Sequence, residues 1–191
     1  MLEMTHPPKT TLITADEFWV FVEALEDKTR GFELIDGEII EMPSGSSLHT
    51  YIISFLITAL FSFARSNKIG YAFADGCTYQ LTDKLILIPD VSYTSTARLN
   101  PPFVKRFKFS PDLAVEVISS SNTHREILKK IEAYLAHGTK LVWIVFPEDT
   151  VVDVWRAMPD GSLNKRTFGM TDTLSGEDVV PHFTLPISHI F

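Results

Sequence analysis

Hydrophobic and polar positions change their period several times along the chain, and each change predicts an element. Apolar residues recur at helical spacing over residues 18–25. Thr14 and Glu17 precede this run with the spacing of a capping box, in which each residue satisfies a backbone N–H of the first turn. The pattern predicts an amphipathic first helix.

A hairpin and a strongly apolar segment come next. The stretch FELIDGEIIEM (32–42) predicts two short strands around Asp36-Gly37, a dipeptide that favours tight hairpin turns. The segment YIISFLITALFSFA (51–64) is 14 residues long and is interrupted by serine and threonine. A membrane span needs about 20 residues, so we expect a buried core helix from about Leu48 to Arg65 and no membrane partner.

The second half of the chain reads as strands with one helix among them. The runs YAFAD, CTYQL, LILI and VSYTS are β-like, and LAVEVIS and LVWIVF are strands that flank a helix expected from His124 to Ala136. Because these two strands are apolar on both faces, the sheet is covered on both sides. We predict one domain over residues 1–191 of the α/β (α+β) class, with a mixed β-sheet flanked by helices on both faces. We expect the closing TLPISHIF to be a short appendage.

The composition indicates the kind of domain and the compartment in which we expect it. The 191 residues are 45% hydrophobic and 21% charged, which is ordinary for a globular domain. The single cysteine, Cys77, excludes an internal disulfide and suits a reducing compartment. The opening residues show no basic start followed by an apolar run, so we expect no signal peptide and a cytoplasmic location.

The charge is negative overall but unevenly distributed. A net charge of −7 argues against a protein that coats nucleic acid, because such binding depends on Lys and Arg. Residues 98–130, however, hold seven bases and three acids. Lys105 and Arg106 lie there in FVKRFKF, which alternates basic and aromatic residues as strand-binding loops do. A solvated loop anchored by phenylalanines is the alternative.

Glu116 is the most informative residue, because it interrupts the apolar strand DLAVEVIS. A buried ionised carboxylate costs several kcal/mol unless it is paired or bound to a metal. Asp90 follows another apolar run, and two acids on neighbouring strands repel each other unless a cation lies between them. Oxygen ligands alone suit Mg²⁺ or Mn²⁺, whereas zinc would require a Cys/His cluster that the sequence lacks.

Lys130 is the candidate cationic partner of this pair. On the predicted helix it shares a face with Ile127, Ile131 and Tyr134, so its ammonium can reach the end of the Glu116 strand. There it could orient a water or stabilise phosphoryl charge. Lys129 should point about 100° away, into solvent.

Structural readings of the same residues remain open. Glu116 and Lys130 could form only a buried ion pair. Lys130 could instead pair with Glu126, four residues earlier, on an exposed face. Asp90, after a proline, could be a turn residue.

The order of these motifs resembles the Uma-two family, a restriction-endonuclease-like group within the PD-(D/E)XK nuclease superfamily. The likeness covers nearly the whole chain through FELIDGEIIEM, PDVSY, DLAVEVISSS, KKIEAYLAHGT, WIV and the closing HIF. It implies a metal-dependent phosphodiester hydrolase. Asp90 and Glu116 would bind Mg²⁺ or Mn²⁺, Lys130 would be the catalytic lysine, and Glu33 an auxiliary acid.

The chain departs from the superfamily pattern at three positions. The lysine usually lies two residues after the second acid, where this chain has Ile118, so the role falls to Lys130 on the helix. Glu126 stands where the family favours aspartate, and Phe146 stands where an acid often ends the next strand.

Two functions of different classes follow from these patterns. The first is a Mg²⁺-dependent endonuclease that holds nucleic acid, DNA in the first place, weakly and acts as a homodimer. His49, Tyr134, Lys105 and Arg106 would contact its substrate. The second is a non-catalytic binding or regulatory module that keeps the nuclease fold.

Overall fold

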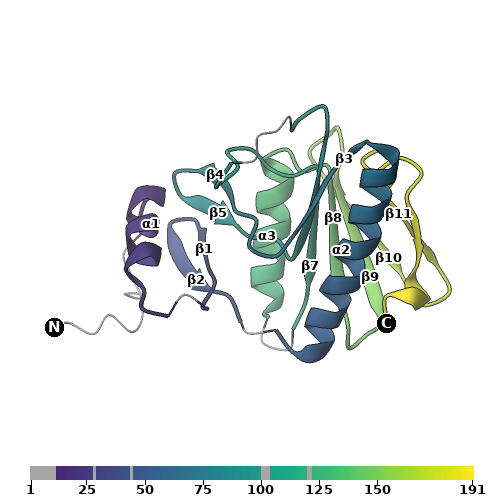
Figure 1. The fold of residues 1–191 in the computed structure, drawn as a ribbon, viewed down its shortest axis with the longest axis horizontal. Helices are drawn as coiled ribbons and strands as arrows, with labels where there is room; N and C mark the ends of the chain where they lie inside the picture. The colour runs from purple at the N-terminus through teal and green to yellow at the C-terminus, as the bar shows by residue number, and fades with distance from the viewer. Residues whose placement is uncertain (1–11, 28, 44, 100–103, 120–121) are drawn as a thin grey trace.

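The computed structural model describes residues 12–27, 29–43, 45–99, 104–119 and 122–191 (Figure 1). The helices are α1 (Ala15–Ala24), α2 (Ser47–Asn67), α3 (His124–Ala136) and the 3₁₀ turn η1 (Ile187–His189). The strands are β1 (Phe32–Ile35), β2 (Glu38–Glu41), β3 (Gly70–Ala74), β4 (Tyr79–Thr82), β5 (Leu85–Leu87), β6 (Val91–Ser95), β7 (Leu113–Val117), β8 (Leu141–Phe146), β9 (Val151–Ala157), β10 (Leu163–Phe168), β11 (Thr173–Ser175) and β12 (Thr184–Pro186).

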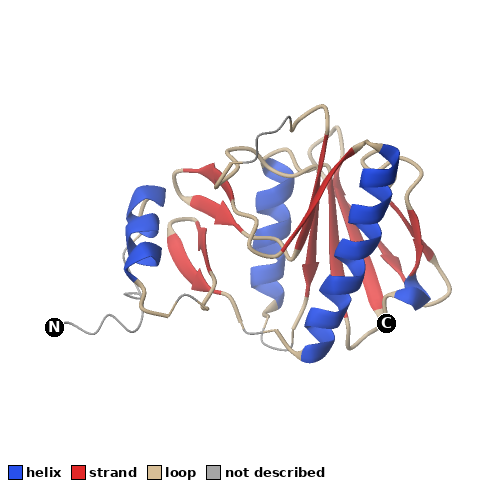
Figure 2. Cartoon of the chain, in the orientation of Figure 1, coloured by secondary structure: helices blue, strands red, loops and turns tan. Residues whose placement is uncertain are grey.

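A six-stranded mixed sheet forms the centre of the molecule, in the order β10-β9-β8-β7-β6-β3. Strands β7 and β8 are parallel and are joined by α3, and the other pairs are antiparallel. Helices α2 and α3 lie on opposite sides of this sheet (Figures 1 and 2). The predicted mixed sheet with helices on both faces is therefore confirmed.

A second sheet, of order β2-β1-β5-β4, lies beyond α3 and was not predicted. One of its faces packs on α3 through Ile35, Leu85 and Leu87, and its other face packs on α1. From one side to the other, the layers are α1, the small sheet, α3, the large sheet and α2 (Figure 1). Helix α3 is thus enclosed between two sheets.

Local sequence signals explain where the elements begin and turn. The capping box of Thr14 with Glu17 is present at α1. The β1–β2 hairpin turns through Asp36 and Gly37, both with positive φ (54° and 80°), as a primed two-residue turn requires. Gly138, at φ 95°, follows the end of α3. These local predictions are confirmed.

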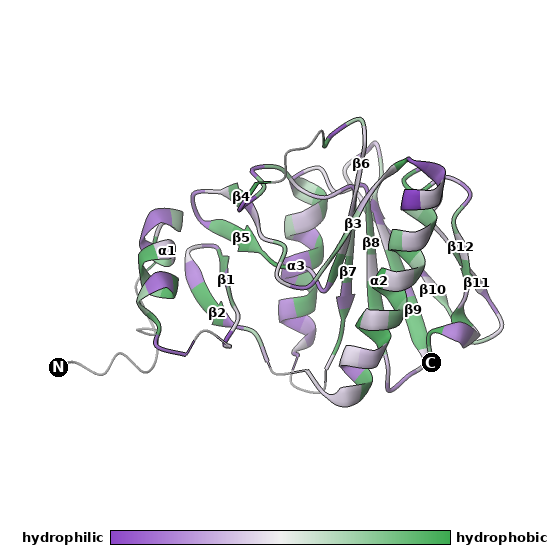
Figure 3. Cartoon of the chain, viewed as in Figure 1, coloured by the Kyte–Doolittle hydropathy of each residue, from purple (hydrophilic) through white to green (hydrophobic). Residues whose placement is uncertain are grey.

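Two expectations about burial were wrong. Only 22% of the most apolar 18-residue window of α2 is buried, although the helix is long and apolar enough to cross a membrane by composition. Its inner face packs on the large sheet, while its outer face is mostly white to green in Figure 3. The C-terminal segment is not an appendage, because Ile187 and Ile190 are fully buried in the main core.

Candidate active site

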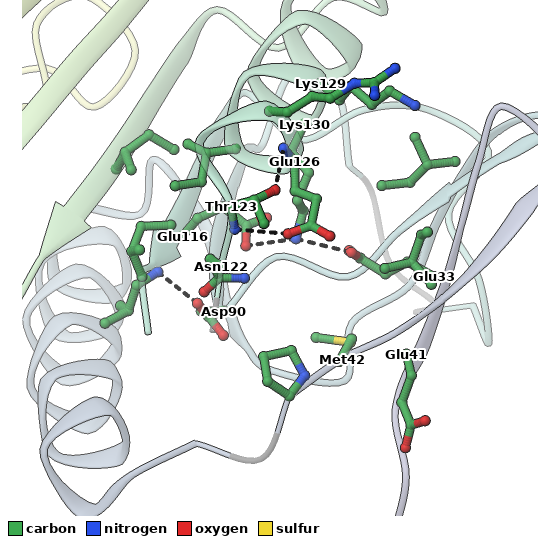
Figure 4. A pocket seen from close by; sticks show the side chains of 18 of the residues that line it. Glu33, Glu41, Met42, Asp90, Glu116, Asn122, Thr123, Glu126, Lys129 and Lys130 are labelled. Carbon is green, nitrogen blue, oxygen red and sulfur yellow. Dashed lines mark hydrogen bonds and ion pairs between the residues drawn. The ribbon is translucent and has the colours of Figure 1, made fainter. Parts of the chain in front are cut away.

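A cleft of about 610 Å³ opens between the β1–β2 hairpin, the first half of α3 and the carboxyl end of β7. The hairpin forms one wall, α3 forms another, and the large sheet forms the floor (Figure 4). Glu33, Asp90, Glu116 and Lys130 all line it. Four residues selected from sequence thus meet at one cleft.

Glu116 reaches the cleft because of the alternation along β7. Its neighbours Val115 and Val117 pack into the core on the α2 side, so Glu116 points toward α3. Val91 of β6 pairs with Val115, which places Asp90 beside Glu116 on the adjacent strand. One oxygen of Asp90, Oδ2, accepts a hydrogen bond from the Val117 N–H at 2.7 Å.

Lys130 lies between two buried carboxylates (Figure 4). Its Nζ is 2.7 Å from Glu116 Oε2 and 3.1 Å from Glu33 Oε2. The other oxygen of Glu33, Oε1, accepts a hydrogen bond from the Ile88 N–H at 2.7 Å. An acid of the small sheet, an acid of the large sheet and a lysine of the helix between them are thereby joined.

Tyr134 completes the surroundings of Glu116. It is fully buried, and its hydroxyl donates a hydrogen bond to Glu116 Oε1 at 2.7 Å. Lys130 and Tyr134 therefore each bind one oxygen of the same carboxylate, from consecutive turns of α3.

If Glu33, Asp90 and Glu116 are all ionised, their three negative charges face the single positive charge of Lys130. Burial, only partly offset by Lys130 and reinforced by the nearby Asp90 and Glu33, raises the pKa of Glu116 to about 8. Burial by itself would lower the pKa of Lys130, but the Glu116 and Glu33 carboxylates outweigh it and raise that pKa. Lys130 is therefore an ammonium at neutral pH, and burial together with the neighbouring acids keeps the pKa of Glu116 above that of a solvated carboxyl group.

His49 and Asp75 both lie near Asp90, with His49 lining the cleft and Asp75 at the end of β3. The Nε2 of His49, in the first turn of α2, is 3.6 Å from Asp90 Oδ2, and this interaction raises the pKa of His49. Asp75 follows β3, whose Ala74 pairs with Val91, so it stands across from Asp90. Partial desolvation and then the Asp90 charge raise the pKa of Asp75. In the sequence, Asp75 stood out only as the last residue of the YAFAD run. Its position at the end of a strand was the signal that could have identified it as a neighbour of Asp90.

Helix α3 presents basic residues at the edge of the cleft. Arg125 and Lys129 line it, and Lys129 Nζ is 3.6 Å from Asp36 Oδ2. The expectation that Lys129 points away into solvent was therefore wrong. Glu126 forms a capping box with Thr123, whereas Lys130 turns inward, so the alternative Glu126–Lys130 surface pair is also wrong.

Lys105 and Arg106 lie outside this cleft. They are 3.7 Å and 3.5 Å from Glu23 Oε1, and the Arg106 guanidinium stacks 3.5 Å from the centre of a Trp19 ring. Both side chains lie near α1, and their contact with substrate stays a prediction. The phenylalanine that opens the FVKRFKF stretch lies outside the described residues.

The donor set fits a hard divalent ion better than a soft one. Within the described part of the chain, no three or more His, Cys, Asp or Glu side chains form a ready-made metal cage. Mg²⁺ and Mn²⁺ need less, since one or two carboxylates and several waters suffice. Asp90 and Glu116 supply that minimum at an open cleft, with Lys130 as the cation beside them.

A mixed sheet with acids on adjacent strands and a lysine facing them defines a nuclease-like fold. The model of the Uma2 family, described as "Putative restriction endonuclease", matches residues 19–188, and the chain belongs to this family. No curated protein matches the chain.

A solved structure agrees with this assignment at the level of the fold. The chain is similar to a crystal structure from Anabaena variabilis described as "a putative nuclease belonging to DUF820". The TM-score is 0.80 at 24% identity, over 94% of this chain and 97% of the other. The match to the family model confirms the resemblance to the Uma-two family stated from sequence.

Proposed function

We propose that this protein is a divalent-metal-dependent phosphodiester hydrolase, an endonuclease that cuts DNA. The observation that carries the proposal is the convergence of Asp90, Glu116 and Lys130 at an open cleft of a nuclease-like fold. The three side chains come from β6, β7 and α3, so a purely local structural role does not explain the arrangement.

Asp90 and Glu116 would hold Mg²⁺ or Mn²⁺. When bound, such an ion supplies positive charge to the phosphate and lowers the pKa of water. The Val117 N–H orients Asp90 for this role, and the other oxygen of Asp90 accepts no hydrogen bond from the described part of the chain. Tyr134 fixes the orientation of Glu116.

Lys130 would stabilise negative charge on the phosphoryl oxygens. It has three donor hydrogens, and two of them are directed to Glu116 and Glu33, so a third remains for substrate or water. Glu33 keeps the ammonium in place from the opposite wall. The same carboxylate is a candidate acceptor for a proton from the attacking water.

The charges at the edge of the cleft suit an anionic chain that enters along α3. Arg125 and Lys129 lie on that side, whereas Glu38 and Glu41 line the hairpin side. A phosphate backbone would therefore be attracted to one wall only, which agrees with weak overall binding by a chain of charge −7.

The activity test uses supercoiled plasmid and single-stranded DNA with Mg²⁺ or Mn²⁺. The wild type should cut, while Asp90→Asn, Glu116→Gln and Lys130→Ala should each lose about 100-fold or more in rate. Lys108→Ala and Asp149→Asn, at exposed positions outside the cleft, are the matched controls and should cut normally. Cutting by all three cleft variants would refute the proposed roles.

Metal binding is tested separately by the effect of Mn²⁺ on thermal unfolding. Mn²⁺ should stabilise the wild type but not Asp90→Asn. If Mn²⁺ stabilises the protein and no DNA or RNA is cut, the chain is a metal-binding module that has lost catalysis. If neither effect appears, the non-catalytic reading is the better one and Glu116–Lys130 is a structural pair.

A further inference from the structure

The edges of the two larger sheets are protected to different degrees. Exposed backbone edges invite pairing with other chains, and charges or bulges normally prevent it. Strand β10 carries Lys165 and Arg166, and β2 has Glu38 and Glu41 at its ends. Strand β4 is interrupted by a bulge and is bridged to Phe107. These three edges therefore show recognised protection.

Strand β3, the remaining edge, carries no charge, proline or bulge. Its sequence GYAFA contains no charge and no proline, and its register with β6 is regular over all five residues. Its outer side pairs with no strand of the described chain. A groove of about 510 Å³ runs along it, lined by Tyr71, Ala72 and Phe73 together with Phe61 and Arg65 of α2.

The outer face of α2, beside this groove, is equally unusual. Residues 47–64 contain no Asp, Glu, Lys or Arg. Leu48, Tyr51 and Phe61 have exposed fractions of 48%, 60% and 46%. A helix on the surface of a monomer normally turns a charged face to water, and a helix that is apolar on most sides is normally covered.

We propose that a second copy of this chain covers both features, in a two-fold dimer. Strand β3 would pair antiparallel with its counterpart and extend the sheet across the axis, and the outer faces of the two α2 helices would pack together. In a two-fold contact the same surface of both copies meets, and each end of it faces the opposite end in the other copy. The surface must therefore be complementary to itself.

The distribution of charge meets that requirement. Arg65 and Lys68 lie at one end of the surface, where α2 ends and β3 begins. The exposed Asp75 lies at the other end, directly after β3. An antiparallel pairing brings the basic end of one copy to the acidic end of the other, while the uncharged middle meets itself. A parallel pairing would place like charges together.

The first test measures molar mass by light scattering during gel filtration over a range of concentrations. The wild type should elute at twice the 21.6 kDa of the chain. Tyr51→Lys with Phe61→Lys should weaken association about 100-fold or more, because lysines would be buried opposite each other. Val20→Lys with Met158→Lys, at exposed apolar positions elsewhere (69% and 44%), is the matched control and should remain dimeric.

The second test determines the relative direction of the two α2 helices by cross-linking in a Cys77→Ala background. Equal amounts of Tyr51→Cys and Phe61→Cys chains are mixed and treated with a short bismaleimide. Antiparallel helices predict a dominant 51–61 product, whereas parallel helices predict 51–51 and 61–61 products. Thermal unfolding of each variant confirms that it is folded.

Three results would overturn the proposal. The wild type could be monomeric at every concentration, the dimer could survive both lysines on α2, or cross-linking could favour like pairs. For a monomer, sedimentation with phosphatidylcholine vesicles would assign the face to a membrane, and failure to sediment would assign it to a different protein. The dimer test does not depend on DNA cleavage, so its failure leaves the proposed nuclease activity untouched.

Discussion

Two buried carboxylates stand at opposite ends of β7 and have opposite properties. Asp112, just before the strand, accepts a hydrogen bond from the Ser95 N–H at 2.8 Å and ion pairs from Arg98 and Lys140 at 3.1 and 3.0 Å. Burial alone would raise the pKa of Asp112, but these donors outweigh it and hold the pKa below its ordinary value. At the other end, burial raises the pKa of Glu116 to about 8.

The difference lies in the number of cations available to each acid. Asp112 has two basic side chains to itself, both able to reach water, and is 1% exposed. Glu116 shares one lysine with Glu33 and has Asp90 beside it. A structural carboxylate is saturated with positive charge, whereas the Glu116 cluster is short of it. That deficit is what a divalent ion would correct.

The largest effect of a substitution is expected when the shared cation is removed. Lys130→Met leaves Glu33 and Glu116 buried without a positive partner, and should lower the free energy of unfolding by about 3 kcal/mol at pH 9. The loss should be smaller at pH 5, where the carboxyl groups can be protonated. Chemical denaturation at both pH values checks this, and an equal loss at both would show that the cluster is not short of charge.

Removing the structural acid should cost less, and this loss should also shrink in acid. Asp112→Asn should lower the free energy of unfolding by about 2 kcal/mol at pH 7, because Arg98 and Lys140 lose their partner but remain in contact with water. The folded pKa of Asp112 lies below its unfolded value, so its stabilisation exists above that value and is lost as pH falls through the folded pKa. Denaturation at pH 7 and pH 3 should show the difference between variant and wild type shrinking in acid.

The pH dependence of Glu116 should run the other way. Its folded pKa of about 8 exceeds the ordinary 4.5, so the unfolded chain releases this proton first as pH rises. The wild type in EDTA should therefore lose up to about 5 kcal/mol relative to Glu116→Gln between about pH 4.5 and 8, at about 1.4 kcal/mol per pH unit. Parallel stability curves for the two proteins would show that Glu116 is ionised in the fold, as Asp112 is.

The smallest effect concerns the Tyr134 hydroxyl, in the third turn of α3. Tyr134→Phe deletes the hydrogen bond to Glu116 Oε1 and should cost about 1 kcal/mol. Tyr51→Phe provides a matched comparison, because the Tyr51 side chain is 60% exposed and the change deletes only a hydroxyl. Losing that hydroxyl should cost less than losing the Tyr134 hydroxyl, as measured by thermal unfolding.

Local sequence signals predicted much of the fold and the centre of the candidate site. Capping boxes, the Asp36-Gly37 turn and the apolar strands act over a few residues, so they could be read directly. Glu116 stood out because its type conflicts with its setting, and helical spacing correctly placed Lys130 and Tyr134 on its side of α3.

The remaining features depend on contacts between distant segments. The small sheet arises from the pairing of β1 with β5, more than 50 residues apart, which no local pattern specifies. The approach of Asp75 to Asp90 follows from strand register, and Arg106 is drawn away from the cleft by Trp19 of α1. Periodicity shows which face a residue occupies, but it does not show what that face meets.

The two contacts that α3 makes with Glu116 show that one acid can be reached from two positions along a helix. Lys130 and Tyr134 are one helical turn apart, about 6 Å along the axis, yet both reach the same carboxylate. A helix that packs alongside β7 therefore has more than one position from which a side chain can contact Glu116. Ile118 packs with the core around α3, while the positive charge beside Glu116 is supplied from the neighbouring layer. A site held between layers in this way tolerates relocation of a functional group so long as the layers keep their spacing.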